Sequence, residues 1–400
     1  MEQAQGSILA INGGSSSIRF ALFAAGNITE RTLSGKIDRI GLPGTTLTAT
    51  TAAAPVTALP AGDFPSSIRF LLDWLDERQA LDGVVAVGHR VVHGMRHAAP
   101  ERVTPQLLAQ LRGLIAYDPE HLPAEIRLME ALLQRLPQRP QLACFDTAFH
   151  RTLPRVASVL PIPRRYEALG VRRYGFHGLS YACLMEQLAA LGDPAARAGR
   201  VILAHLGNGA SLAAVRDGAC VDTTMGFTPA AGVPMSTRSG DLDPGLVSFL
   251  AATEQMTAAA FQRMVTRESG LLGVSGTSSD VRDLLGMETT DIRAAEALAL
   301  FCQEIRKRIG AFAAVLGGLD TLVFSAGIGE NSAVIRGRIC AGLEFLGLRL
   351  DERRNAAHAG VISTSGSNVT VRVLRTDEER MIAQLVRDYV RQCAGEQSLE

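Results

Sequence analysis

The sequence predicts an α/β protein built from two related lobes, and three observations indicate this fold class. The chain has 400 residues, which is more than one ordinary hydrophobic core holds. A strand, a glycine-rich turn and a second strand occur in the same order at two places. Between and after these places, predicted helices alternate with short predicted strands, which is typical of α/β architecture.

The repeated pattern is a hairpin with a tip of small residues. In the first copy, the apolar run 8–11 leads into Asn12, two glycines and three serines, and a strand follows over 18–23. The second copy has a strand over 201–206, the tip Gly207–Gly209 and a strand over 211–215. Leu9, Gly13, Ser17 and Ile18 match Leu203, Gly207, Ser211 and Leu212 at one constant offset of 194. The repeat predicts two lobes of common plan.

Periodicity and composition place the other elements. We expect helices over 67–81, 294–316 and 378–393, and strands over 84–88 and 321–325. The segment 41–63 is rich in Thr, Ala, Pro and Gly and is expected to be loop or irregular edge. We place the N-terminal lobe at 1–148 together with the C-terminal helix 381–400, and the C-terminal, nucleotide-binding lobe at 149–380.

Charge and composition exclude several function classes. Lys+Arg and Asp+Glu both number 40, so a nucleic-acid-binding surface over the whole molecule is not expected. Lys36 and Lys307 are the two lysines, and neither lies in a Walker A loop or a protein-kinase strand motif. Without a basic leader, a long apolar run or paired cysteine spacings, we expect a cytoplasmic protein that has no membrane segment, disulfide framework or zinc site.

Glycine-rich tips can bind phosphate because no side chain keeps backbone N–H groups away from the phosphate oxygens. One such tip is equally consistent with a tight turn, but two copies at equivalent lobe positions favour a nucleotide bound between them. A third glycine-rich segment, Phe324–Asn331, follows a predicted strand and resembles a ligand loop, although its glycines could also be turn glycines. It lacks the GxGxxG spacing, which excludes a Rossmann motif.

Ten motifs distributed along the chain resemble those of the acetokinase family, which comprises acetate kinase and its propionate and butyrate relatives. They are NGGSSSIRF, GHRVVHG, FDTAFH, RRYGFHG, HLGNGAS, MGFTP, TRSGDLDPG, SGTSSDVRDL, AGIGEN and TDEE, and they run from about residue 8 to about residue 381. The resemblance implies the duplicated, ribonuclease H-like fold of the superfamily that includes acetate and sugar kinases, actin and heat-shock chaperone ATPases. It also implies a homodimer.

The resemblance implies a set of catalytic residues. Arg90 and Arg238 match two active-site arginines, whose planar forks suit carboxylate and phosphoryl oxygens. His177 and His121 match histidines that contact the transferring group, whereas an isolated histidine is more often structural. Asp146 matches an essential aspartate that holds the metal or orients the arginines, although it could also be a helix N-cap.

Metal and nucleotide positions follow from the same resemblance. Asn12 and Glu378 match positions associated with Mg²⁺, for which Mn²⁺ is a possible substitute; Glu379 is an alternative to Glu378, which could also be a first-turn helix acid. Asp280 could instead be only a helix N-cap. The residues expected to bind ATP or ADP are Ser17, Arg19, His205, Leu206, Gly207, Asn208, Gly209, Asp280, Val281, Arg282, Gly327, Ile328, Gly329, Glu330 and Asn331.

The expected reaction is reversible, direct in-line transfer of the ATP γ-phosphoryl group to acetate, which gives acetyl phosphate and ADP. The expected acyl pocket contains Arg90, Val92, Glu120, Phe176 and Pro229. Glu120 stands where the family usually has leucine, Leu122 replaces a common asparagine, and Arg19 replaces a usual lysine. Propionate or butyrate kinase therefore stays an alternative, as does a catalytically idle ATP-binding assembly protein.

Overall fold

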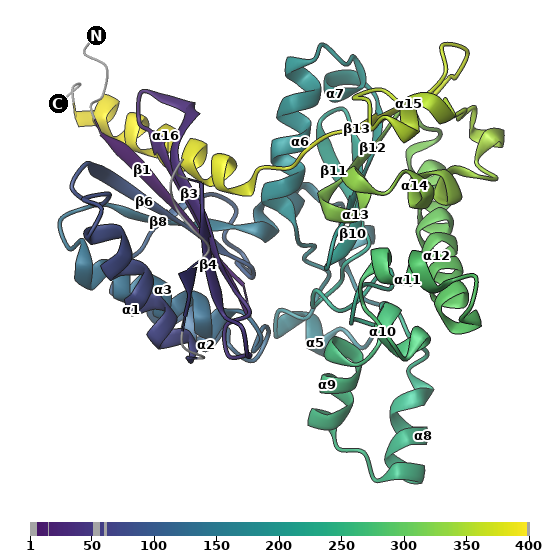
Figure 1. The fold of residues 1–400 in the computed structure, drawn as a ribbon, viewed down its shortest axis with the longest axis horizontal. Coiled ribbons are helices and arrows are strands. Elements are labelled where there is room, and N and C mark those ends of the chain that lie inside the picture. Colours follow the sequence, from purple (N-terminus) through teal and green to yellow (C-terminus); the bar gives the residue numbers. More distant parts are fainter. Residues whose placement is uncertain (1–5, 15, 51–56, 60–61, 398–400) are drawn as a thin grey trace. The chain divides into compact units, whose positions relative to one another are not determined.

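The computed structural model describes residues 6–14, 16–50, 57–59 and 62–397, the last four of them by their backbone alone. Ser15 of the first glycine-rich tip and parts of the expected loop 41–63 lie outside the described residues. The chain divides into two compact units, 1–148 with 377–400, and 149–376. Each unit contains one sheet covered by helices (Figure 1).

The first unit contains an eight-stranded sheet of order β5-β4-β3-β2-β1-β6-β8-β7. Its elements are β1 (Ser7–Gly13), β2 (Ile18–Ala24), β3 (Asn27–Asp38), β4 (Thr46–Ala49), β5 (Thr57–Ala58), α1 (Phe64–Asp76), β6 (Val84–Val91), β7 (Glu101–Arg102), α2 (Pro105–Gly113), α3 (Leu122–Arg135), β8 (Gln141–Phe145) and α16 (Glu378–Gln397). A 3₁₀ segment, η1 (Asp146–Thr152), follows β8.

Alternation along β1 positions the first functional side chain. Leu9 and Ile11 pack in the core that also contains residues of α1 and α3. Side chains two apart in a strand share a face, so Ile8, Ala10 and Asn12 lie on the opposite face, which α16 covers. On β6, a Cβ on Gly88 would lie 2.4 Å from Ile382 of α16, so the absence of a side chain there permits close helix packing. Arg90 lies two residues further along β6, on the same face.

The second unit contains a five-stranded sheet of order β11-β10-β9-β12-β13. Its strands are β9 (Arg200–Leu206), β10 (Ala210–Arg216), β11 (Ala219–Thr223), β12 (Thr321–Ser325) and β13 (Thr370–Val373). Its helical segments are α4 (Arg155–Ser158), α5 (Arg165–Ala168), α6 (Gly178–Ala190), α7 (Ala195–Ala198), α8 (Gly245–Glu254), α9 (Ala258–Arg267), α10 (Gly270–Ser275), α11 (Val281–Met287), α12 (Ile292–Leu316), α13 (Ala326–Asn331), α14 (Ala333–Cys340), η2 (Glu344–Leu346) and α15 (Glu352–Ala356).

The two sheets share a common plan, as the repeat predicts. In each, an antiparallel hairpin and a third antiparallel strand are followed by two strands parallel to the first: β3-β2-β1-β6-β8 in one unit and β11-β10-β9-β12-β13 in the other. The prediction of α/β lobes of related plan is therefore confirmed.

The constant offset of 194 is wrong for the second strand of each hairpin. Leu9 pairs with Leu22, and the matching Leu203 pairs with Ala213. Leu22 of the first hairpin therefore corresponds to Ala213 of the second, an offset of 191. Residues 14–17 lie between the paired Gly13 and Ile18, whereas only Asn208 lies between Gly207 and Gly209, whose backbones hydrogen-bond. The first tip is thus longer, and Ser17 and Ser211 are not equivalent.

Several boundaries differ from those expected: α1 ends at Asp76 rather than at 81, and β6 extends to Val91 rather than to 88. Helix α16 starts at Glu378, so a lobe boundary at 381 divides this helix. Helix α1 starts at Phe64 rather than Ser67 because the Asp63 carboxylate caps it by accepting from the Ser66 backbone N–H. Over the parts of the chain that the structure describes, no helix is both long and apolar enough to cross a bilayer.

Candidate active site

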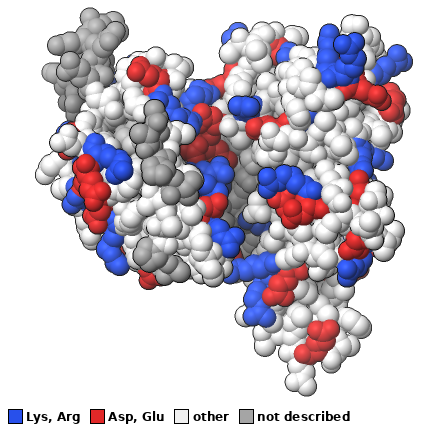
Figure 2. Space-filling model, viewed as in Figure 1, with Lys and Arg blue, Asp and Glu red and all other residues white. Residues whose placement is uncertain are grey.

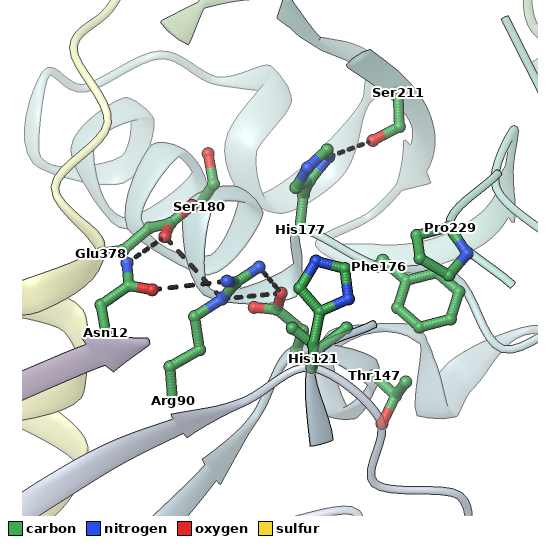
Figure 3. Close-up of polar contacts among 12 residues, drawn as sticks. Asn12, Arg90, His121, Thr147, Phe176, His177, Ser180, Ser211, Pro229 and Glu378 are labelled. Atoms are coloured by element: carbon green, nitrogen blue, oxygen red, sulfur yellow. Dashed lines mark hydrogen bonds and ion pairs between the residues drawn. The ribbon is translucent and has the colours of Figure 1, made fainter. Parts of the chain in front are cut away.

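In the first unit, Arg90 is the centre of a polar cluster at the ends of β1, β6 and β8. Its Nε and Nη2 atoms donate to Oδ2 of Asp146 at 3.0 and 2.6 Å, and Nη1 donates to Oδ1 of Asn12 at 3.3 Å. The Asn12 amide nitrogen donates to Glu378 at 2.8 Å and to Glu379 at 3.2 Å. Figure 3 shows Arg90 pointing toward Asn12 and Glu378. The cluster therefore joins three of the predicted positions to Arg90.

Burial and the neighbouring carboxylates have opposite effects on the pKa of the Arg90 guanidinium. Its side chain is 13% exposed, and Asp146 is fully buried. Burial alone would lower the pKa of the Arg90 guanidinium, but the carboxylates of Asp146, Glu378 and Glu125 raise it above its ordinary value. Arg90 therefore stays charged in a partly dry environment, where a cation attracts an anionic ligand more strongly than it does in water.

A second group of titratable residues lies where α3 begins. His121 Nδ1 lies 2.9 Å from Oδ1 of Asp118, and the same oxygen accepts from the His121 backbone N–H at 3.3 Å. Both carboxylate oxygens of the buried Glu125 lie 3.2 Å from the Val92 backbone nitrogen. Burial raises the pKa of Glu125 well above its ordinary value, and Asp118 raises it further, while Arg90 lowers it. Asp118 and Glu125 were not predicted as site residues.

The remaining residues predicted in the first unit have different environments. Val92 is buried, Glu120 is partly buried and Arg19 is exposed on β2. The Ser17 carbonyl accepts from Gly14 N–H at 2.7 Å within the first tip. These residues make no direct hydrogen bond to Arg90 among those described, so their predicted roles stay predictions.

The residues predicted to hold a divalent metal have oxygen-bearing side chains. Asn12 and Glu378 carry a carboxamide and a carboxylate oxygen, which are hard ligands suited to Mg²⁺; in this structure the Asn12 oxygen accepts from Arg90 and its nitrogen faces Glu378, so the carboxamide would have to turn to bind the ion. Within the described ranges, no group of three or more His, Cys, Asp and Glu residues is arranged to hold a metal. Mg²⁺ usually binds one or two protein groups and keeps several waters, so this small oxygen set fits it.

In the second unit, His177 is the centre of another cluster. It precedes α6 with φ of 59°, a left-handed conformation that costs energy for a residue with a side chain. Its Nδ1 lies 2.8 Å from Ser211 Oγ, a contact drawn as a dashed line in Figure 3. The His177 ring stacks on His205 with centroids 4.1 Å apart. His205 Nδ1 in turn lies 2.8 Å from Ser180 Oγ. Both histidine rings are therefore held through Nδ1 by a serine hydroxyl.

A buried histidine that was not predicted lies below this loop. His150 Nε2 donates to the Phe176 carbonyl at 2.9 Å, so its Nδ1 can accept the Cys220 S–H, 3.2 Å away. A Cβ on Gly175 would lie 2.6 Å from the His150 ring, and Gly175 has φ of 76°, so glycine suits this position on both grounds. Burial lowers the pKa of His150 to about 4, which keeps the ring neutral. It acts as a support for the backbone that leads into His177.

Arg238 lies against the second glycine-rich tip. Its Nη1 donates to the Pro229 carbonyl at 3.1 Å. A Cβ on Gly209 would lie 3.2 Å from His177 Nε2 and 3.5 Å from Arg238 Nη1. Gly209 thus allows the histidine and the arginine to approach the same stretch of backbone, and both predicted side chains lie together beside it.

The second unit also contains a cavity of about 530 Å³ bordered by two glycine-rich segments. Of the residues expected to bind nucleotide, eight line it: Gly207, Asn208, Asp280, Val281, Arg282, Gly327, Ile328 and Asn331. Asp280 caps α11 by accepting from the Arg282 N–H at 2.8 Å and also pairs with the Arg282 guanidinium. Ser236, Ser279, Leu285 and Ser332 also line the cavity and were not predicted.

The segment Phe324–Asn331 forms the end of β12 and α13, and its members divide into two groups. Gly327, Ile328 and Asn331 line the cavity, whereas Gly329 and Glu330 do not. The Glu330 carboxylate accepts from the Ala326 N–H at 2.8 Å and the Thr376 N–H at 3.3 Å. His205, Leu206 and Gly209 likewise lie outside the cavity lining. For these residues the geometry indicates support of the loops.

Arg336 holds the other end of α13. Its fully buried guanidinium donates to the carbonyls of Gly329 and Glu330 at 2.8 and 2.9 Å and to the Asn355 side chain at 2.8 Å. A cation is favourable at a helix C-terminus, where carbonyl groups lack intrahelical partners. The Glu330 carboxylate binds the first backbone N–H of α13, and the Arg336 guanidinium binds its last carbonyls. These contacts hold α13 so that Gly327 and Ile328 line the cavity.

Comparisons with known proteins agree with this arrangement. Residues 7–384 match the model of the acetokinase family. An acetate kinase of Methylocella silvestris is 43% identical over 94% of this chain and 96% of its own, and a propionate kinase of Citrobacter freundii is 44% identical over 94% and 95%.

Solved structures give the same result. A propionate kinase from Francisella tularensis superposes with a TM-score of 0.89 at 34% identity, over 96% of this chain and 99% of that one. Porphyromonas gingivalis acetate kinase superposes with a TM-score of 0.86 at 35% identity, over 96% and 100%. With a family match over nearly the whole chain and the same fold in these relatives, the chain belongs to the acetokinase family.

Proposed function

We propose that the chain is an acetate kinase that transfers the γ-phosphoryl group of ATP reversibly to acetate, giving acetyl phosphate and ADP. The observation that carries this proposal is the largely buried, charged Arg90 held by Asp146 and Asn12. Acetate and phosphoryl oxygens are anionic, and a preorganised guanidinium fork binds them in a defined orientation. The membership of the acetokinase family supports the same activity.

The chemistry requires charge compensation more than proton transfer. Acetate is ionised at neutral pH, so an acetate oxygen can attack the γ-phosphorus directly while the bond to the β-phosphate oxygen breaks and ADP leaves. In this proposal Arg90 and Arg238 bind acceptor and phosphoryl oxygens, His177 and His121 contact the transferring group, and Asp146 orients Arg90. The Asp146 hydrogen bonds to both Nε and Nη2 support this last role.

ATP or ADP is proposed to bind in the cavity bordered by Gly207, Asp280 and Gly327. Other predicted residues are proposed to help bind the nucleotide by holding the backbone of the binding loops or by their charge. They are Ser17, Arg19, His205, Leu206, Gly209, Gly329 and Glu330. Asn12 and Glu378 are proposed to hold Mg²⁺, with Mn²⁺ as a possible substitute; the ion would neutralise charge on the phosphate oxygens.

Propionate kinase is the second candidate, because relatives named acetate kinase and propionate kinase are equally similar to this chain. Val92, Phe176 and Pro229 are proposed as the apolar lining of the acyl site, together with Glu120. One methylene changes selectivity by only about 1 to 3 kcal/mol, so kinetics must decide. Steady-state kcat/KM on acetate, propionate and butyrate should favour acetate, and Glu120→Leu should raise activity on the longer acids. A wild-type preference for propionate would replace acetate as the assigned substrate.

A hydroxamate trap tests the activity itself. Wild-type protein with ATP, Mg²⁺ and acetate should form acetyl phosphate, which hydroxylamine captures, and Arg90→Ala should not. Tight ATP binding without any trapped product would instead favour the idle, assembly-type protein.

We also propose that the enzyme is a cytoplasmic homodimer that uses the α8–α9 hairpin as its interface. α8 has no buried residue, and it exposes Leu246, Val247 and Phe249. Figure 2 shows mostly uncharged surface over the hairpin tip. A second copy of this apolar, nearly uncharged helix is the occupant that fits it. Light scattering should give a dimer for wild type and a monomer for Phe249→Glu; a monomeric wild type would refute the proposal.

A further inference from the structure

The segment before α3 contains a histidine and an aspartate whose geometry is more specific than a surface ion pair. Oδ1 of Asp118 accepts from two donors of one residue, the backbone N–H and the ring Nδ1 of His121. Asp118 is 2% exposed and His121 is 12% exposed. A buried acceptor that holds both the backbone and the ring of one residue leaves the ring little rotational freedom.

The second oxygen of Asp118 is also informative. Oδ2 is buried and has no hydrogen-bond partner among the described residues. Glu125 on α3, Arg90 on β6 and Asp146 after β8 are the charged groups in this corner, and Asp118 raises the pKa of Glu125 after burial itself. A buried unsatisfied carboxylate oxygen costs about 1 to 3 kcal/mol, so a structural role alone accounts poorly for an acid here.

We propose that Asp118 is a positioning residue that holds the His121 ring by Nδ1, so that Nε2 is the nitrogen presented to the transferring phosphoryl group. This inference rests on the proposed function of His121 in phosphoryl transfer. Asp118 does not touch the substrate in this proposal and acts only through His121.

The tautomer follows from the identity of the acceptor. An ionised carboxylate only accepts hydrogen bonds, so Nδ1 carries a proton and Nε2 is the nitrogen that Asp118 leaves for a ligand. An anionic ligand requires a donor at Nε2, which an imidazolium, protonated on both nitrogens, provides while Nδ1–H still donates to Asp118. The same division of roles between an orienting aspartate and a reacting histidine occurs in serine protease triads.

The substitution Asp118→Asn should keep the orientation while removing the charge. The His121 backbone N–H can only donate, so it requires an oxygen at the Oδ1 position and thereby fixes which way the new carboxamide points. That oxygen then still accepts from Nδ1–H. The substitution Asp118→Ala removes both hydrogen bonds and frees the ring.

The experiment combines kinetics with the tautomer of His121. In full-length protein labelled with ¹⁵N-histidine, the His121 signals are assigned by comparison with His121→Gln, and ¹H–¹⁵N correlation identifies the protonated nitrogen. We expect Nδ1–H in wild type and Asp118→Asn, and a mixture of tautomers in Asp118→Ala. We expect kcat for acetyl phosphate formation to fall about 10- to 100-fold in Asp118→Ala, with KM for ATP unchanged and a smaller loss in Asp118→Asn.

A matched histidine–carboxylate pair in the same unit provides the control. His97 Nδ1 lies 2.6 Å from Oε1 of Glu101, outside the proposed machinery. Glu101→Gln should change the His97 signals and leave kcat unchanged. A wild-type His121 whose Nδ1 carries no proton, or unchanged kcat and tautomer in Asp118→Ala, would overturn the positioning role. An inactive wild type with Nδ1–H on His121 would refute only the proposed function.

Discussion

Substituting either Arg90 or Asp146 should lower the free energy of unfolding of the first unit, because the two side chains form an ion pair. Removing one partner of a buried ion pair typically costs about 3 to 5 kcal/mol, because the other charge stays desolvated. For Asp146→Asn we expect the lower end, about 3 kcal/mol, since Glu378 still lies 3.9 Å from Arg90 Nε. For Arg90→Met we expect about 3 to 5 kcal/mol, since Asp146 is fully buried.

The double variant distinguishes this pair interaction from general damage. If the two side chains stabilise each other, Arg90→Met with Asp146→Asn should cost about 2 kcal/mol less than the two single changes together. Urea unfolding followed by tryptophan fluorescence measures this, because Trp74 is the one tryptophan of the sequence and lies on α1 of the first unit. Strictly additive single changes would show that the pair is not energetically coupled and would refute the reasoning. The hydroxamate assay on Asp146→Asn should show a 100-fold or larger loss, on the order seen when a preorganised charge is removed.

Three further changes test other parts of the molecule. Gly327→Val should raise KM for ATP about tenfold, because a Cβ there would enter open space at the cavity. The matched change Gly310→Val on α12, where a Cβ also meets open space but outside the cavity lining, should leave KM unchanged. Burial lowers the pKa of His89 to about 4 from 6.5, so the first unit should lose about 3 kcal/mol of stability as the pH falls from 6.5 to 4, and His89→Leu should flatten that dependence in urea titrations. Asn12→Ala should raise the Mg²⁺ concentration for half-maximal rate about tenfold at saturating ATP, with KM for acetate unchanged.

Local sequence signals were sufficient to predict the two hairpins and a few further helices and strands, but not every element or every boundary. The strand over 321–325 was predicted at its observed limits, because its apolar run ends at a serine and a glycine-rich turn. The long helix was expected from Ala294 but starts at Ile292, because Asp291 accepts from the Arg293 N–H and caps it. Capping residues such as Asp63 and Asp291 therefore carried boundary information that hydrophobic periodicity does not contain.

The motif Phe324–Asn331 was predicted to be a ligand loop, and three of its residues, Gly327, Ile328 and Asn331, line the cavity. A linear motif does not say which members face a ligand once the segment becomes helical. Ile328, Asn331 and Ser332 are spaced by three and four residues and share one face, whereas Gly329 and Glu330 face elsewhere. Ser279 lies inside the motif SGTSSDVRDL and Ser236 directly precedes TRSGDLDPG, but neither motif says which of its serines faces the cavity, and only the fold brings the two to the same wall.

Backbone strain at Ala326 explains how the two walls of the cavity keep their spacing. Ala326 has φ of 63°, a left-handed conformation in which glycine would be less strained. The Ala326 methyl group packs close to Gly207: a Cβ placed on Gly207 would lie only 3.4 Å from Ala326 Cβ. Glycine at 326 would not make this contact. The methyl therefore fills the space over Gly207, and the Glu330 carboxylate holds the strained backbone through the Ala326 N–H. The strain, on the order of 1 to 3 kcal/mol, is thus offset by contacts that fix Gly207 and Gly327 relative to each other.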